Sequence, residues 1–199
     1  MVNFYVGINY SDGIVMASDL LAVALSGKRE EMQKLHYKEK IVIGWAGAGF
    51  FEELEIGIQN LLANFSVEDI VAKEFSRFSS HGLAEARRRY APIAPFDVQP
   101  PQLHSIIAYL GNLTFRLLYD DGSGSPLKQR SDVEVLYPIS EDISDFISAA
   151  EHSSRQQALD LAISFIRNKN RKYPDEFSGL EVIDLTASGT SQILHESVS

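Results

Sequence analysis

Apolar residues occupy every second position near the start of the chain. This alternation runs from Phe4 to Tyr10 and resumes over residues 14–18, which is the pattern of two half-buried strands. Ser11-Asp12-Gly13 separates the two runs, and Asp-Gly is a strong hairpin signal because it supplies the positive φ that tight turns need. The sequence therefore predicts a β-hairpin whose second strand ends in an acid, Asp19.

The rest of the first half predicts two more strands and then a helix. Residues 34–36 and 41–46 read as a strand pair around a turn at 37–40, whereas residues 20–32 are less regular. Apolar residues then repeat at helical spacing, which predicts a helix over 49–64.

A second helix is predicted over residues 67–80. It begins at Ser66, and Asp69 stands three residues further on, in the register of a capping box. The helical pattern continues to about Tyr90, and we expect a break near Gly82 because glycine weakens a helix.

The second half of the chain repeats this order of strands followed by helices. Gly111-Asn112 marks a turn between two strands, and Gly122-Ser123-Gly124-Ser125-Pro126 marks a flexible connection before the next strand. The predicted strands cover 104–110, 113–119, 132–137, 180–186 and 190–195, and the predicted helices cover 142–152 and 155–171.

Strands followed by helices, twice, with a final strand pair, differ from the strict alternation of a parallel βαβ array. We therefore expect an α+β fold, a four-layer αββα sandwich of two antiparallel sheets. Helices at 49–64 and 67–80 should cover one side, and helices within 142–171 the other. Four prolines between Pro92 and Pro101 indicate an extended loop, which we interpret as part of a single domain covering residues 1–199.

Composition and charge narrow the function classes. The chain has 199 residues, of which 45% are hydrophobic, a net charge of −9 and no cysteine. The missing cysteines exclude disulfides and thiolate chemistry, and the negative charge argues against nucleic-acid binding, which needs clustered cations. The one dense cluster, Arg87-Arg88-Arg89, lies beside Glu85 in a predicted helix, where such runs usually face water. No apolar run is long enough to span a membrane and the first residues do not resemble a leader, so we expect a cytoplasmic protein with no membrane partner.

Three common cofactor and catalytic motifs are incomplete or missing in the sequence. Gly47-Ala48-Gly49 precedes a helix as in a phosphate-binding loop, but it lacks the third glycine, and Glu52 and Glu53 would repel a phosphate. The five histidines show no pair at metal-ligand spacing, and no G-x-S-x-G motif marks a serine nucleophile. We therefore expect neither a cofactor nor a metal.

Four stretches of the chain resemble one known family. They are VGINYSDGIVMASD (6–19), QKLH (33–36), IVIGWAGAGF (41–50) and LDLAISFIRNKNRKYPDEFSG (159–179), the last of which precedes the strand LEVIDL. In this order they resemble the subunits of the 20S proteasome and their bacterial relatives, which belong to the N-terminal nucleophile hydrolases. The resemblance implies the sandwich fold and assembly as a homo-oligomer or as a ring with related subunits.

The resemblance also implies a candidate catalytic centre. In active members an amino-terminal Thr attacks a peptide carbonyl and its own α-amine handles the proton. The matching residue here is Asn3, whose amide has no nucleophilic oxygen. Asp19 and Lys34 match the family's acid and the lysine whose positive charge lowers the pKa around the nucleophile.

Three further positions match supporting residues of that centre. Gly47 matches the glycine whose backbone N–H points at the developing oxyanion. Asp175 and Ser178 match, at the same spacing, an acid and a serine that support the nucleophile's amine. The family's Gly-Ser-Gly after a late strand is replaced here by residues 137–142.

Two interpretations of the charged pair stay open. Asp19 and Lys34 are either the remains of a catalytic centre or a partly buried ion pair that holds the hairpin to the next strand. Three function classes follow: a proteasome-like subunit without peptidase activity, an amide hydrolase whose nucleophile comes from processing or an unusual residue, and a binding module that uses the cleft for a ligand. We favour the first, as a structural or regulatory member of an oligomeric ring.

Overall fold

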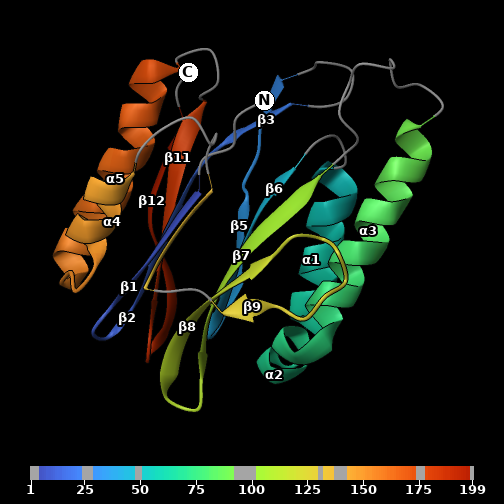
Figure 1. Ribbon diagram of the computed structural model, residues 1–199, viewed down its shortest axis with the longest axis horizontal. Coiled ribbons are helices and arrows are strands. Elements are labelled where there is room, and N and C mark those ends of the chain that lie inside the picture. Colours follow the sequence, from blue (N-terminus) through green and yellow to red (C-terminus); the bar gives the residue numbers. More distant parts are fainter. Residues whose placement is uncertain are drawn as a thin grey trace.

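The chain folds into four layers, with helices outside two stacked antiparallel sheets (Figure 1). The computed structural model describes residues 5–23, 29–47, 51–91, 102–129, 132–136, 143–173 and 178–197. Figure 1 shows α4 (Ser144–Ala150) and α5 (Arg155–Lys172) outside one sheet, and α1 (Phe51–Asn64) and α3 (Phe75–Tyr90) outside the other. The predicted α+β sandwich is therefore confirmed.

The first sheet places the predicted hairpin at its centre. Its strand order is β10-β1-β2-β11-β12, and every neighbouring pair in it is antiparallel. β2 therefore lies between the first strand of the chain and a strand from its last part. The strands are β1 (Tyr5–Tyr10), β2 (Gly13–Asp19), β10 (Val133–Leu136), β11 (Gly179–Thr186) and β12 (Gly189–Ser197).

The second sheet has the order β5-β6-β7-β8-β9, and it is also antiparallel throughout. A separate two-stranded ribbon, β3 with β4, lies in the segment whose sequence shows no regular period. The strands are β3 (Leu21–Val23), β4 (Arg29–Glu31), β5 (Leu35–Lys38), β6 (Ile41–Gly47), β7 (Leu103–Gly111), β8 (Thr114–Asp120) and β9 (Lys128–Gln129).

Three apolar layers hold the sandwich together, because each strand of the central region buries both of its faces. One layer lies between α5 and the first sheet, one between the two sheets, and one between the second sheet and helices α1 and α3. Representative side chains of the three layers are Val6 and Ile166, Met16 and Ile106, and Ile43 and Phe75.

The turn of the first hairpin forms as predicted, but for a different reason. Neither Asp12 nor Gly13 has a positive φ. A Cβ atom at position 13 would instead lie 2.3 Å from the hydroxyl of Tyr10 and 2.4 Å from the carbonyl oxygen of Leu185. Gly13 is therefore required for space between three adjacent strands.

The second predicted helix is irregular at a different point from the one expected. Ser66 caps it, since its hydroxyl accepts a hydrogen bond from the backbone N–H of Asp69 at 3.1 Å. The chain then passes from α2 (Val67–Asp69) through a π-helical segment, η1 (Ile70–Glu74), into α3. The predicted break near Gly82 is wrong, because α3 runs through that position without interruption.

Other local predictions have mixed outcomes. The turn between β7 and β8 uses Asn112 and Leu113, with φ values of 51° and 62°, one residue later than predicted. The glycine-serine connection after β8 is ordered by Asp120 and Asp121, whose carboxylates accept hydrogen bonds from the N–H groups of Gly122 and Ser123. The proline-rich loop at 92–101 lies outside the described residues. No helix in the described part of the chain is long and apolar enough to cross a membrane.

Candidate functional site

Antiparallel pairing brings distant parts of the chain to one end of the sandwich. β2 ends at Asp19, and its neighbours β1 and β11 begin there, so that Leu180 lies opposite Asp19. The backbone N–H of Leu20 donates a 3.1 Å hydrogen bond to the carbonyl of Gly179, which extends this contact past the ladder. β5 begins and β6 ends at the same end of the second sheet.

A buried ion pair lies at this end. Nζ of Lys34 is 2.8 Å from Oδ2 of Asp19, and the two side chains are 1% and 0% exposed. Oδ2 also accepts a 3.1 Å hydrogen bond from the backbone N–H of Leu21. Because each charge would be strongly disfavoured if it were buried alone, the pair must be made for both residues to remain ionised.

Glu181 on β11 is a third charged residue of this site, and the sequence analysis missed it. Its Oε1 accepts hydrogen bonds from the backbone N–H groups of Lys34 at 2.7 Å and Leu35 at 2.8 Å. The hydroxyl of Ser18 lies 3.1 Å from the same oxygen. Glu181 therefore links its own sheet to the segment that carries Lys34.

Burial shifts the protonation of the acidic groups in the site. Burial raises the pKa of Glu181 to about 7, although its three hydrogen-bond donors and the charge of Lys34 oppose the shift. The pKa of the Tyr5 hydroxyl is also raised, first by burial and then by the negative charges of Asp19 and Glu181. The ring of Tyr5 lies 5.7 Å from Nζ of Lys34, so an aromatic face lines the cation.

One sequence signal could have revealed Glu181. It lies in LEVIDL, a strand that is apolar apart from two acids, and both acids are fully buried. A buried acid needs partners, so each should mark a contact. The second acid, Asp184, accepts from the hydroxyl of Tyr10 at 2.8 Å and from Nε of Arg155 at 2.7 Å.

The remaining predicted residues are placed only in part. Ser178 directly precedes β11, and its buried hydroxyl has no hydrogen-bond partner among the described residues. Gly47 ends β6 opposite Leu103, and its role toward an oxyanion stays a prediction. Asn3 and Asp175, like the 137–142 segment that replaces Gly-Ser-Gly, lie outside the described residues.

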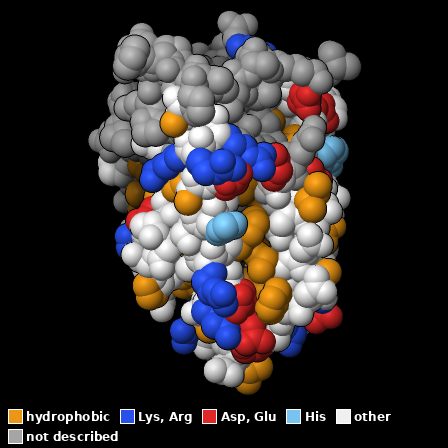
Figure 2. Space-filling view, turned by 90° about the vertical axis from the view of Figure 1, so that its right-hand side faces the viewer, with side chains coloured by type: hydrophobic (Ala, Val, Ile, Leu, Met, Phe, Trp, Pro, Cys, Tyr) orange, Lys and Arg blue, Asp and Glu red, His pale blue; other side chains and the backbone are white. Residues whose placement is uncertain are grey.

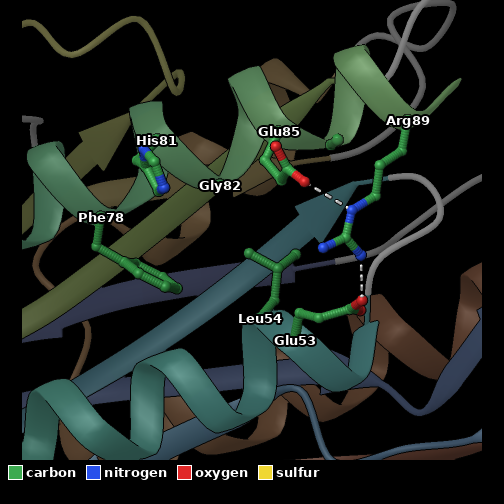
Figure 3. Close-up of a pocket in the computed structure, with 8 residues that line it drawn as sticks. Glu53, Leu54, Phe78, His81, Gly82, Glu85 and Arg89 are labelled. Carbon is green, nitrogen blue, oxygen red and sulfur yellow. Dashed lines mark hydrogen bonds and ion pairs between the residues drawn. The ribbon is translucent and has the colours of Figure 1, made fainter. Parts of the chain in front are cut away.

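A groove separate from this site lies between α1 and α3 (Figure 3). It encloses about 200 Å³, and its apolar lining includes Leu54, Phe78 and Ala86. Arg89 lies at one end and bonds to both Glu85 and Glu53 at 2.8 Å. Figure 2 shows this face, on which apolar side chains are exposed between groups of charged ones.

The charges beside this groove neutralise one another. Arg88 is also paired with Glu85, at 2.7 Å, and the hydrogen bonds from both arginines lower the pKa of Glu85 to about 2. The arginine cluster therefore forms an exposed, internally paired helix end, as its sequence pattern indicates. Neither this groove nor the neighbouring one near Glu74 and Arg77 is lined by Asp19 or Lys34.

One solved structure with the same fold is Anbu (ancestral beta-subunit) from Yersinia bercovieri. The similarity has a TM-score of 0.68 and covers 96% of this chain and 86% of that chain, at 13% sequence identity. No family model matches the chain, and the comparison with curated proteins finds no similar sequence. At this level of identity the likeness shows the fold alone.

The resemblance to 20S proteasome subunits is therefore corrected by this comparison. Anbu is proteasome-related but forms a distinct family, so the assignment to the 20S subunits is wrong. Four short sequence stretches and the order of strands and helices carried that resemblance, and features of this kind can belong to a whole fold and not to one family within it. The chain shares its fold with this structure.

Proposed function

We propose that this chain is a proteasome-like subunit without N-terminal-threonine peptidase activity, which acts as a structural or regulatory member of a homo-oligomer. The observation that carries the proposal is the closed Asp19–Lys34 pair. Each charge is satisfied by the other at 2.8 Å and both are excluded from solvent. A buried pair in which each charge compensates the other fits a structural role at this end of the sandwich.

The chemistry of position 3 supports the same conclusion. An amide at Asn3 can hydrogen-bond to a charged pair, but it cannot form an acyl-enzyme, because it has no oxygen or sulfur nucleophile to activate. In this mechanism the α-amine of the nucleophilic residue serves as general base, and residue 3 has no free α-amine while residues 1 and 2 precede it. A position of Asn3 close to Asp19 and Lys34 stays a prediction, because residue 3 lies outside the described residues.

The proposal of a homo-oligomer is supported by exposed apolar residues in and next to α1. Ile56 is 59% exposed in α1 and Phe65, directly after it, is 41% exposed. The groove between α1 and α3 also has apolar side chains in its lining. Exposed apolar surface is typical of interaction sites. Sedimentation should therefore give a species larger than a dimer, whereas about 22 kDa over a wide concentration range would rule out the assembly.

Peptidase activity is the decisive test. The intact mass first establishes which residue forms the N-terminus, and the purified protein is then incubated with fluorogenic peptides and with an electrophile that traps threonine proteases. We expect neither turnover nor labelling. Arg167→Ala, which removes an exposed ion pair far from position 34 in sequence, serves as the folded control for Lys34→Ala.

The amide-hydrolase alternative has a distinct outcome in this test. Peptide hydrolysis that survives in Arg167→Ala but is lost in Lys34→Ala would overturn the proposal in favour of an amide hydrolase. An N-terminus trimmed to Thr or Ser would point the same way. A cytoplasmic location remains a prediction.

A further inference from the structure

Three polar residues form one row across the first sheet. Tyr5 lies opposite Ser18, and Ser18 lies opposite Glu181, so the three side chains project from the same face of β1, β2 and β11. Tyr5 belongs to the apolar layer between the two sheets. The row is fully buried, and it therefore places a carboxylate between sheets where apolar side chains are the rule.

The carboxylate of this row reaches the backbone of the other sheet. Successive N–H groups of an extended strand point to opposite sides. Those of Lys34 and Leu35 nevertheless converge on one oxygen, Oε1 of Glu181, at 2.7 and 2.8 Å. Two successive N–H groups that converge in this way form an anion-binding concavity. This contact lies at the start of β5.

We propose that Glu181 is a positioning residue for Lys34: it anchors the backbone from which that side chain extends, so that the ammonium group meets Asp19. The proposal goes beyond the proposed function, because it concerns how the pair is held and applies whether or not the chain hydrolyses peptides. The carboxylate of Glu181 accepts from the main-chain N–H of Lys34, whereas the carboxylate of Asp19 accepts from the side-chain ammonium group of Lys34. The two acids thus fix different ends of one lysine.

The charges of the site make this anchor sensitive to protons. Lys34 offsets the charge of Asp19, so an ionised Glu181 adds a second negative charge to the buried group. Its Oε2 has no hydrogen-bond partner among the described residues and can take a proton without breaking a contact. The titratable groups coupled to Glu181 are Tyr5 from β1 and Lys34, which directly precedes β5. Asp19 from β2 acts on Tyr5 and pairs with Lys34. Protonation of Glu181 weakens its Oε1 as an acceptor, so its hydrogen bonds to the N–H groups of Lys34 and Leu35 become weaker.

Nuclear magnetic resonance of the folded wild-type protein tests the anchor directly. The amide resonances of Lys34 and Leu35 and the Nζ resonance of Lys34 are followed between pH 5.5 and 8.5. We expect all three to shift with one common midpoint near the pKa of Glu181, which is about 7. Glu181→Gln keeps an oxygen acceptor but cannot titrate, so the two amides should stay protected and the common shift should disappear.

Asp184→Asn is the matched control, because Asp184 is an equally buried acid on the same strand with other partners. It should leave the common shift in place. Glu181→Leu removes the acceptor, so exchange of the Lys34 and Leu35 amides should accelerate at least about tenfold. Resonances that do not move with pH, a shift that persists in Glu181→Gln, or a shift that Asp184→Asn abolishes equally would each overturn the proposal. If Glu181→Leu does not fold, the comparison of Glu181→Gln with Asp184→Asn still decides.

Discussion

Nζ of Lys34 lies 2.8 Å from Oδ2 of Asp19, and neither side chain reaches solvent. The two residues are 15 positions apart in the sequence, at the end of β2 and just before β5. Their ion pair therefore links the first sheet to the second. A buried pair of this kind contributes little net stability compared with apolar residues, but either charge left alone is costly.

The first prediction concerns the loss of one partner. Asp19→Asn and Lys34→Met each leave one buried charge uncompensated, so each should lower the free energy of unfolding by about 3 kcal/mol. The double variant Asp19→Asn/Lys34→Met should lose less than the sum of the two, because neither charge remains. Urea unfolding followed by circular dichroism measures all three values.

The Arg167–Glu196 pair provides the control for this prediction. These residues bond at 2.9 Å but are half-exposed. Arg167→Ala should therefore change the free energy of unfolding by less than about 1 kcal/mol. If the buried single variants behave like Arg167→Ala, or if the double variant shows strict additivity, the two buried charges do not depend on one another.

The second prediction concerns pH. The folded chain raises the pKa of Glu181 from 4.5 to about 7, so between these values the folded state holds a proton that the unfolded state has released. Stability from this group is fully present below pH 4.5 and is lost as the pH rises toward 7. Relative to Glu181→Gln, the wild type should lose about 3 kcal/mol across this window. Urea unfolding of both proteins at several pH values measures the difference, and a difference independent of pH would contradict the raised pKa.

The third prediction compares two glycines on the helices that line the groove. A Cβ atom at Gly57 of α1 would lie 2.2 Å from the ring of Phe78 on α3, whereas one at Gly82 meets only Leu54, at 3.7 Å. Gly57→Ala should therefore displace the ring and lower the free energy of unfolding by about 1 kcal/mol or more. Gly82→Ala should raise it by about 0.5–1 kcal/mol, because alanine favours a helix interior. Thermal unfolding of the two variants checks the opposite signs, and a shared sign would contradict the close packing of Gly57 against Phe78.

The fourth prediction concerns the turn between β7 and β8. Leu113 has a φ of 62° and is 92% exposed, so it carries backbone strain without contributing to the core. Asn112 precedes it at φ 51°, and Asn-Gly is the preferred pair for a turn with two positive φ values. Leu113→Gly should therefore stabilise the chain by about 0.5–1 kcal/mol, as measured by thermal unfolding. Leu113→Ala keeps a Cβ atom and should show no comparable gain.

Much of the fold follows from local patterns in the sequence. The alternation from Phe4 to Tyr10 and the helical repeats each define a face that must be buried, and the capping residue Ser66 marks where a helix begins. Antiparallel sheets between helices are one of the few ways to bury such faces together. The structure shows Asp19 and Lys34 paired and buried, which is compatible with both interpretations of these residues in the sequence.

Only the tertiary structure decided the contacts that depend on register and close approach. Glu181 reaches the N–H of Lys34 across 147 positions of sequence, and no local period encodes that distance. Gly13 is needed because Tyr10 and Leu185 approach it from two neighbouring strands, and not because of its own φ. The sequence by itself determined which faces are apolar, since periodicity acts within one element. The partners of buried polar groups were decided by strand order and packing, because these bring together residues that the chain keeps far apart.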